Sequence, residues 1–521
     1  MPILSLPDSD VSLTSSLRDA AEARIWLANQ PQTQPLRLLR ALLKEVRALD
    51  TCVNVPATRL ELLDALRPAI IHAQDGAHIR YSHKPLPLLQ DEHDAFELAR
   101  DLWHAFAVAY LRVVPQLAPP LLLQALHRAA VALRQALHCH FIAGIEVPPD
   151  YLCLLYEILI TAESQRLQRT AVEDPDYTFL SQSTIAGDVA WSFLLLFSDP
   201  YRFSQAQFNV ANRAFSRWCD LAGFQAEPSE DRRAKTIALA NWIGEAVVSV
   251  DGRPQWLDVR PVVRKIRQRV DSLEAGETPE KLKLGRELTP SSCIRLMRDL
   301  DHALRPKPKP IGNTLDLNTI DLVFGNENLY FLLSGKTLTE NKLSAQSASV
   351  SHDRIAVFGF DNITNRIDHV AKTQAPAETW TVEDNWILRA APDGGQVVVP
   401  MLVGIRPEKN GVPQLAVLLG LRQTNDGWLA ANLRLLPKPP ASGIQKVAGA
   451  ATPGAQPNRQ PVFLLPAEDE EGAHPTICLT TGSGLRQGSL LALEESTVEH
   501  IRLGEVVERG SNFVRFAYAR T

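Results

Sequence analysis

Apolar residues recur at helical spacing from about Leu13 to Leu304, as in Leu36, Leu39 and Leu43. Each such segment carries one apolar stripe, and proline, glycine and aspartate positions separate the segments. The pattern predicts an all-helical N-terminal domain over residues 1–305. Its longer helices are expected at residues 92–114, 120–144, 150–170, 188–198, 204–222, 231–248, 258–275 and 290–304. No repeat of solenoid length is visible, so an irregular bundle is favoured and a solenoid stays open.

The hydrophobic pattern changes after Arg305-Pro-Lys-Pro-Lys-Pro310. Alternating prolines fix φ and remove amide donors, which predicts a stiff linker at residues 306–310. Short apolar runs bounded by turn residues follow and predict strands. These runs are Ile355–Phe358, Gln396–Val399, Gln414–Leu419 and Trp428–Leu436, and Glu327–Phe331 is interpreted as a further strand. An antiparallel β-barrel is therefore expected over residues 311–440.

Turn residues divide the rest of this β-rich half. Asn425-Asp-Gly427 tolerates the left-handed backbone that a tight hairpin needs, and predicts a hairpin between the last two of those runs. Small residues and prolines predict a flexible linker at 441–460, followed by a C-terminal β module at 461–521. That module should end in a hairpin of Ile501–Glu508 and Phe513–Ala519. The predicted fold class is α+β and multidomain.

Composition and charge exclude several classes of protein. The 521 residues are 45% hydrophobic and 22% charged with a net charge of -5, which suits folded domains and disfavours nucleic acid as a main partner. No signal peptide or membrane span is evident. The six cysteines show no ligand-like spacing, as expected for reduced thiols. A cytoplasmic protein without membrane insertion is predicted.

The sequence offers no recognised catalytic motif, so no catalytic residues are assigned and the protein is not expected to be an enzyme. His138-Cys-His140 lies in a predicted helix, where residues two apart point in widely different directions. Such a pair cannot readily grip one metal ion. No metal and no cofactor are predicted.

Short segments along most of the chain carry a resemblance to a known family. They include Lys84–Leu88, Ser198–Tyr201, Leu257–Arg260, Leu402–Arg406 and Leu419–Arg422. In their order and context these segments resemble proteobacterial proteins that carry a PilZ-type domain behind a long helical region. The resemblance implies a PilZ-like barrel and makes cyclic di-GMP a possible ligand.

PilZ domains bind cyclic di-GMP through an RxxxR segment and a downstream [DN]xSxxG segment. No two arginines of the barrel region are four residues apart. At the second motif Asp384 is available, but Trp386 replaces the serine and Arg389 the glycine. The nucleotide motifs are therefore degenerate. The resemblance leaves a tentative ligand-binding set of Asp384, Arg389, Arg406 and Arg422, if these side chains converge on one barrel face.

The favoured function is a non-enzymatic bacterial signalling or scaffold protein whose degenerate PilZ-like domain acts through an unknown protein partner. A genuine cyclic di-GMP receptor with atypical binding residues is the first alternative. An uncharacterised enzyme in the helical half is the second, although it has no positive motif.

Overall fold

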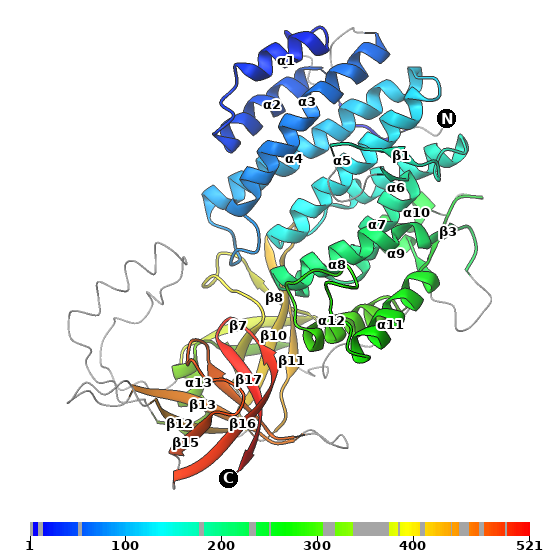
Figure 1. Cartoon of the computed structure of the whole chain (residues 1–521). Coiled ribbons are helices and arrows are strands. Elements are labelled where there is room, and N and C mark those ends of the chain that lie inside the picture. Colours follow the sequence, from blue (N-terminus) through cyan, green and yellow to red (C-terminus); the bar gives the residue numbers. More distant parts are fainter. Residues whose placement is uncertain are drawn as a thin grey trace. The chain divides into compact units, whose positions relative to one another are not determined.

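A computed structural model of the chain shows two compact units (Figure 1). The helical unit contains residues 1–309, 390–397 and 420–429, and the barrel unit contains the remaining residues. The structure describes all residues except 1–3, 9–13, 50–54, 177–181, 229–235, 249–251, 306–317, 337–374, 384–385, 407–411, 439, 448–457, 468–473, 495–497 and 521. The predicted linker at 306–310 lies outside the described residues. The predicted α+β multidomain class is confirmed.

The helical unit contains twelve α-helices within its described residues. They are α1 (Ala20–Ala28), α2 (Pro35–Leu49), α3 (Pro56–Ala77), α4 (Gln90–Val113), α5 (Leu121–Ala143), α6 (Pro149–Ser164), α7 (Ile185–Phe197), α8 (Gln205–Trp218), α9 (Ala240–Ile243), α10 (Glu245–Val248), α11 (Arg260–Glu274) and α12 (Pro290–Ala303). Most predicted helices are confirmed. The helix expected at 231–248 is wrong, because that segment contains a short strand and the brief helices α9 and α10.

Short strands complete this unit. β1 (Val172–Glu173) pairs with β2 (Gln182–Ser183), and β5 (Trp256–Asp258) lies between β3 (Gly223–Gln225) and β4 (Thr236–Ala238).

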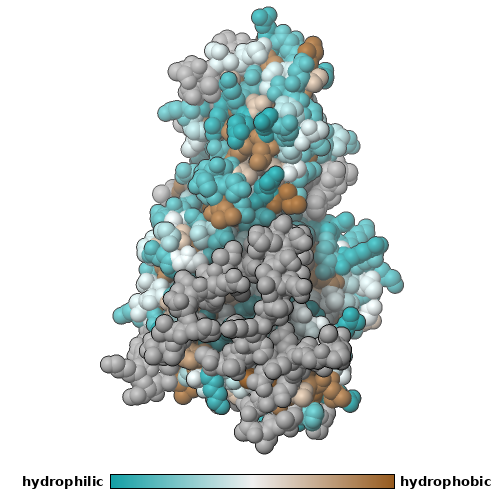
Figure 2. Space-filling model, turned by 90° about the vertical axis from the view of Figure 1, so that its left-hand side faces the viewer, coloured by the Kyte–Doolittle hydropathy of each residue, from teal (hydrophilic) through white to brown (hydrophobic). Residues whose placement is uncertain are grey.

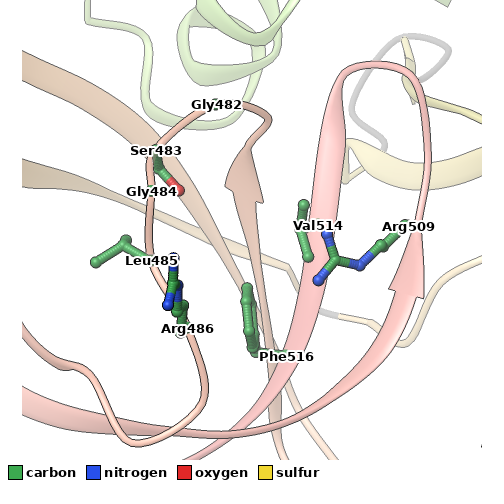
Figure 3. A pocket seen from close by; sticks show the side chains of 8 residues that line it. All are labelled: Gly482, Ser483, Gly484, Leu485, Arg486, Arg509, Val514 and Phe516. Carbon is green, nitrogen blue, oxygen red and sulfur yellow. The ribbon is translucent and has the colours of Figure 1, made fainter. Parts of the chain in front are cut away.

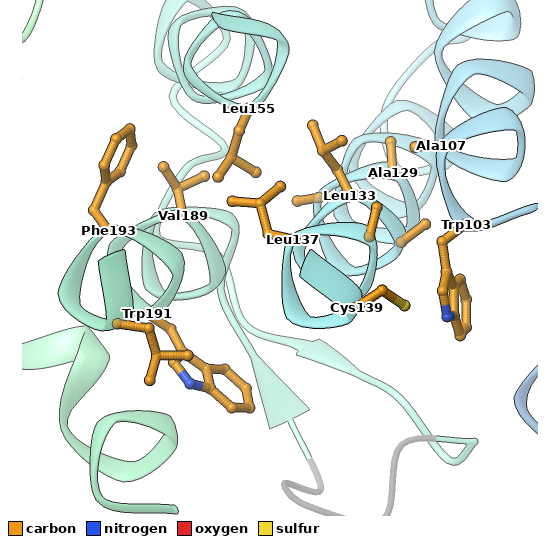
Figure 4. Close-up of a cluster of buried hydrophobic side chains, with 14 of the residues drawn as sticks. Trp103, Ala107, Ala129, Leu133, Leu137, Cys139, Leu155, Val189, Trp191 and Phe193 are labelled. Carbon is orange, nitrogen blue, oxygen red and sulfur yellow. The ribbon is translucent and has the colours of Figure 1, made fainter. Parts of the chain in front are cut away.

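One continuous hydrophobic core runs through the helical unit from Leu17 to Leu304. Helices α4, α5, α6 and α7 pack in succession, and Figure 4 shows their apolar side chains meeting, with Leu137 close to Leu155 and Val189. Trp191 is fully buried and acts as a large core side chain. A single shared core of this kind is typical of an irregular bundle.

The first barrel is closed and antiparallel, and it belongs to the barrel unit except at residues 390, 420–423 and 428–429, which fall in the helical unit. Its strands are β6 (Thr319–Val323), β7 (Ala377–Glu383), β8 (Trp386–Ala390), β9 (Met401–Ile405), β10 (Gln414–Gln423) and β11 (Trp428–Leu435), in the order β10-β11-β8-β7-β6-β9. The predicted hairpin of β10 and β11 is confirmed. Gly427, with φ of 81°, supplies the left-handed position of its turn.

A second closed barrel follows. Its strands are β12 (Ala441–Val447), β13 (Asn458–Leu465), β14 (Thr476–Thr480), β15 (Leu490–Glu494), β16 (Val498–Arg509) and β17 (Phe513–Arg520), in the order β12-β13-β14-β17-β16-β15. β12 lies in the segment expected to be a flexible linker, and it closes the barrel by pairing with both β13 and β15. The predicted C-terminal hairpin is confirmed as β16 and β17.

Two strand predictions are wrong. Glu327–Phe331 lies in helix α13 (Asn326–Ser334), whose Leu329 and Tyr330 are buried in a core that includes Leu402 of the first barrel and Phe463 of the second. Gln396–Val399 forms a single bridge at Val397 rather than a strand. The run at 355–358 lies outside the described residues.

On the face shown in Figure 2, the hydrophobic residues occur in small patches among hydrophilic ones. None of the helices in the described part of the chain is long and apolar enough to cross a membrane.

Candidate functional site

Arg389, a predicted ligand-binding residue, is buried within the first barrel, with 3% of its surface exposed. Its guanidinium donates to Glu378 on the neighbouring strand at 2.5 Å. The guanidinium carbon also lies 5.1 Å from the ring centroid of the fully buried Trp380. A ligand phosphate would have to displace Glu378 to reach this arginine, so the observed contacts describe a structural ion pair.

Arg406 follows β9 and lies 3.5 Å from Asp321 of β6, while its other terminal nitrogen donates to the carbonyl of Ala375. Glu378 of β7 is paired in register with Leu322 of β6, so these two side chains lie on the same face of the sheet. Asp321 is the residue before Leu322 on β6. Since successive strand residues alternate between faces, the carboxylates that hold Arg389 and Arg406 lie on opposite faces of the sheet. These two arginines do not converge.

Arg422 belongs to the helical unit. It lies 3.5 Å from Glu146 and 5.8 Å from the ring centroid of Tyr201. Burial raises the pKa of Tyr201, although the charge of Arg422 opposes that effect. Asp384 lies outside the described residues. The role of all four residues in ligand binding stays a prediction.

The histidines at 138 and 140 are held inside α5. Burial lowers the pKa of both His138 and His140 to about 3, so both rings are neutral at physiological pH. The ring centroids lie 5.2 Å from Phe208 for His138 and 5.1 Å from Phe96 for His140. These contacts are those of core aromatic packing.

Among the described residues, one group has the spacing needed to hold a metal ion: His93, Asp94 and Glu97, at the start of α4. This set was not predicted from the sequence, where its signal is the spacing of i, i+1 and i+4. His93 is half-buried and the two carboxylates are exposed, as is common at the first turn of a helix. The structure offers no second observation that points to a metal there.

The helical unit brings together a serine, a histidine and an aspartate, all buried. The Nε2 atom of His127 lies 2.7 Å from the hydroxyl of Ser183, which in turn donates to Asp188 at 2.8 Å. A catalytic triad needs the histidine between the serine and the acid, whereas here the serine is in the middle. Asp188 also accepts from Arg134 at 3.1 Å. Burial lowers the pKa of His127, although Asp188 opposes it. All three side chains are buried, and the Nδ1 atom of His127 has no hydrogen-bond partner among the described residues, so the arrangement lacks the group that orients the base in a triad.

A pocket of about 260 Å³ opens on the second barrel (Figure 3). Its lining combines two arginines, a glycine-containing loop and apolar side chains, namely Gly482, Ser483, Gly484, Leu485, Arg486, Arg509, Val514 and Phe516. The pocket was not predicted from the sequence. The available signal was the loop Thr481-Gly-Ser-Gly-Leu-Arg486, in which two glycines precede an arginine.

The fold thus defines a helical protein with two small antiparallel barrels and no triad in its described residues. Residues 21–229 match a family model described as "Cyclic-di-GMP receptor FimW, N-terminal domain". The helical region is therefore similar to the N-terminal domain of a cyclic di-GMP receptor family. No curated protein and no solved structure gave a significant match to the chain. The family match does not extend into the barrels, so the PilZ assignment is not shown.

Proposed function

We propose that the protein is a non-enzymatic receptor for cyclic di-GMP that passes the nucleotide signal to a protein partner. The observation that supports this proposal most is the match of residues 21–229 to the N-terminal domain of a cyclic di-GMP receptor. It favours the receptor alternative over a scaffold that ignores the nucleotide.

The chemistry of the helical unit supports a receptor rather than an enzyme. Its most triad-like cluster has Ser183 between His127 and Asp188, and all three side chains are buried. His127 lies within reach of Ser183, but a catalytic base also needs a third group that orients it, and the Nδ1 atom of His127 has no hydrogen-bond partner among the described residues. A receptor that catalyses no reaction signals through a change in its binding to another molecule. The proposal therefore includes a protein partner.

The two closed antiparallel barrels provide surfaces on which a PilZ-like ligand site could be built. The degenerate motif around Arg389 concerns one segment of the first barrel. It does not bear on a site formed by other residues, and the PilZ-like character of the barrels is part of this proposal.

Equilibrium dialysis of the full chain against labelled cyclic di-GMP tests the function. Saturable uptake that unlabelled cyclic di-GMP displaces, and that cyclic di-AMP and GTP do not, is the expected result. Uptake that remains linear up to about 100 µM ligand, equivalent to less than about 5.5 kcal/mol of binding free energy, would contradict the proposal.

A further inference from the structure

The pocket on the second barrel is built on a loop that is fixed at both ends. The hydroxyl of Thr481 donates to the carbonyl of Ser511 at 3.2 Å. At the other end, the amide of Gly488 donates to the carbonyl of Leu503 at 2.7 Å, and the Leu503 amide donates to Ser489 at 2.9 Å. Because β16 and the turn that joins it to β17 hold the two ends of the loop, its residues are ordered before any ligand arrives.

The backbone of this loop is open to a close approach. Gly482 and Gly484 have φ of 82° and 71°, and a Cβ added to either would meet nothing within 4 Å. Glycine occupies these two positions because other residues rarely adopt a positive φ. The empty space beside both residues leaves the main chain accessible. A phosphate could reach the backbone here more closely than along an ordinary loop.

Two arginines line the pocket and have no counter-charge among the described residues. Arg486 comes from the loop and Arg509 from the end of β16, and both are exposed. No ion pair forms to either guanidinium within the described residues. The nearby Glu508 is engaged by Arg434, so it does not neutralise the pocket.

The position of Arg486 is set by its own turn. Its amide donates to the hydroxyl of Ser489 at 3.1 Å, and the Ser489 amide donates back to the carbonyl of Arg486 at 3.0 Å. Gly488, with φ of 86°, supplies the left-handed residue of this turn. On the other side, Arg509 is paired in register with Val514 of β17.

The floor of the pocket is apolar. Phe516 is buried with 2% exposure, while Val514 and Leu485 are half-buried. Figure 3 shows Phe516 and Val514 between Arg486 and Arg509. Two guanidinium groups beside an apolar floor suit a ligand in which an anionic group is joined to a flat, weakly polar ring.

We propose that this pocket binds a phosphodiester of cyclic di-GMP together with the adjoining nucleoside. The inference rests on the proposed function and adds the position of the site. Arg486 and Arg509 donate to the phosphodiester oxygens, and the Gly482–Gly484 backbone lets the phosphate approach. The volume of about 260 Å³ is just below the range of about 300–1,000 Å³ that is common for ligand pockets. The pocket therefore takes one half of the dinucleotide and leaves the other half exposed.

The presence of only two cationic side chains in this pocket favours a dinucleotide over nucleic acid as its ligand. Polynucleotide binding needs many clustered cations, whereas the pocket has two and the whole chain has a net charge of -5. Two arginines more than neutralise the single charge of one phosphodiester, and their planar guanidiniums can donate hydrogen bonds to both of its free oxygens.

Calorimetric titration of the full chain with cyclic di-GMP, and separately with guanosine 5′-monophosphate, tests the assignment. Arg486→Ala and Arg509→Ala should each weaken cyclic di-GMP binding about 10- to 100-fold, because each removes a charge-assisted interaction. Arg502→Ala is the matched control, since Arg502 is an exposed arginine of the same β16 that does not line the pocket. Its affinity should equal that of the parent. Arg486→Lys keeps the charge but loses the fork, and an intermediate affinity is expected.

The outcomes separate the pocket from the function. If the parent binds cyclic di-GMP and the two pocket variants bind it equally well, the pocket assignment is overturned while the receptor function stands. Loss of binding in Arg406→Ala with unchanged binding in the pocket variants would move the site to the first barrel. If cyclic di-GMP gives no heat but the monophosphate binds in an Arg486-dependent manner, the function fails and the phosphate pocket stands. Absence of heat with both ligands overturns both.

Discussion

Replacing Asp174 with asparagine should destabilise the helical unit strongly. The two carboxylate oxygens of Asp174 accept from the guanidinium of Arg67 at 2.5 Å each, and one of them also forms an ion pair with Nη1 of Arg128 at 2.6 Å. Asp174 and Arg67 have side chains only 2% exposed, and that of Arg128 is 8% exposed. The substitution keeps the shape of the side chain but leaves two buried cations short of an anion.

The magnitude follows from the loss of a buried charge partner. Breaking a buried ion pair by removing one member costs about 3–5 kcal/mol. Asp176 lies 3.1 Å from Arg67 and Asp64 lies 3.7 Å from Arg128, so both retain some compensation. We therefore expect a loss at the lower end of that range, about 3 kcal/mol.

Urea unfolding of the full chain, followed by helical circular dichroism, measures this loss. The matched control is Asp176→Asn, because Asp176 is 32% exposed and shares only one contact with Arg67. The control should cost less than about 1 kcal/mol. If Asp174→Asn unfolds within about 0.5 kcal/mol of the parent, the buried cluster does not stabilise the fold and the reasoning is refuted.

The same aspartate predicts an acid dependence. Burial alone would raise the pKa of Asp174, but the hydrogen bond and charge of Arg67, with the charge of Arg128, bring it below its ordinary value of 3.8. Its contribution to stability is therefore complete above that ordinary value and is lost as pH falls through the lower folded pKa. In the Asp174→Asn variant this acid-dependent loss should be absent.

Two further predictions concern the first barrel. Leu433→Ala should lower the free energy of unfolding by about 2–4 kcal/mol, because Leu433 on β11 is only 8% exposed. Trp428→Ala on the same strand should lower it much less, because Trp428 is 43% exposed. Denaturant unfolding measures both changes. Arg389→Ala should lower the thermal stability but leave cyclic di-GMP affinity unchanged, because Arg389 is engaged by Glu378 inside the barrel. A loss of affinity with normal stability would return Arg389 to the binding site.

The parts of the fold that local patterns specify could be predicted from the sequence. Helical periodicity and the Asn425-Asp-Gly427 turn act over a few residues, and the helices and the β10–β11 hairpin are found where those signals lie. Leu329 and Tyr330 show where prediction from local sequence fails. A short aromatic and aliphatic run fits a strand or a helix, and burial in the core shared by the two barrels accompanies the helical outcome.

Long-range pairing explains the other differences. Ala441–Val447 has the small and polar residues of a linker, yet it becomes β12 because β13 and β15 supply its hydrogen-bond partners. The pocket has the same origin. Arg486 and Arg509 are separated in the sequence, and they line the same pocket because hydrogen bonds to Leu503 anchor the loop to β16. Neither arginine carries a local signal for this proximity.

The receptor function is tested most directly by a saturation titration of the unmodified full chain with cyclic di-GMP in a calorimeter. We predict a saturable, one-site isotherm with a Kd below about 10 µM, corresponding to more than about 6.8 kcal/mol of binding free energy. A titration that releases no heat above the dilution control up to about 100 µM, at two temperatures, would contradict the account.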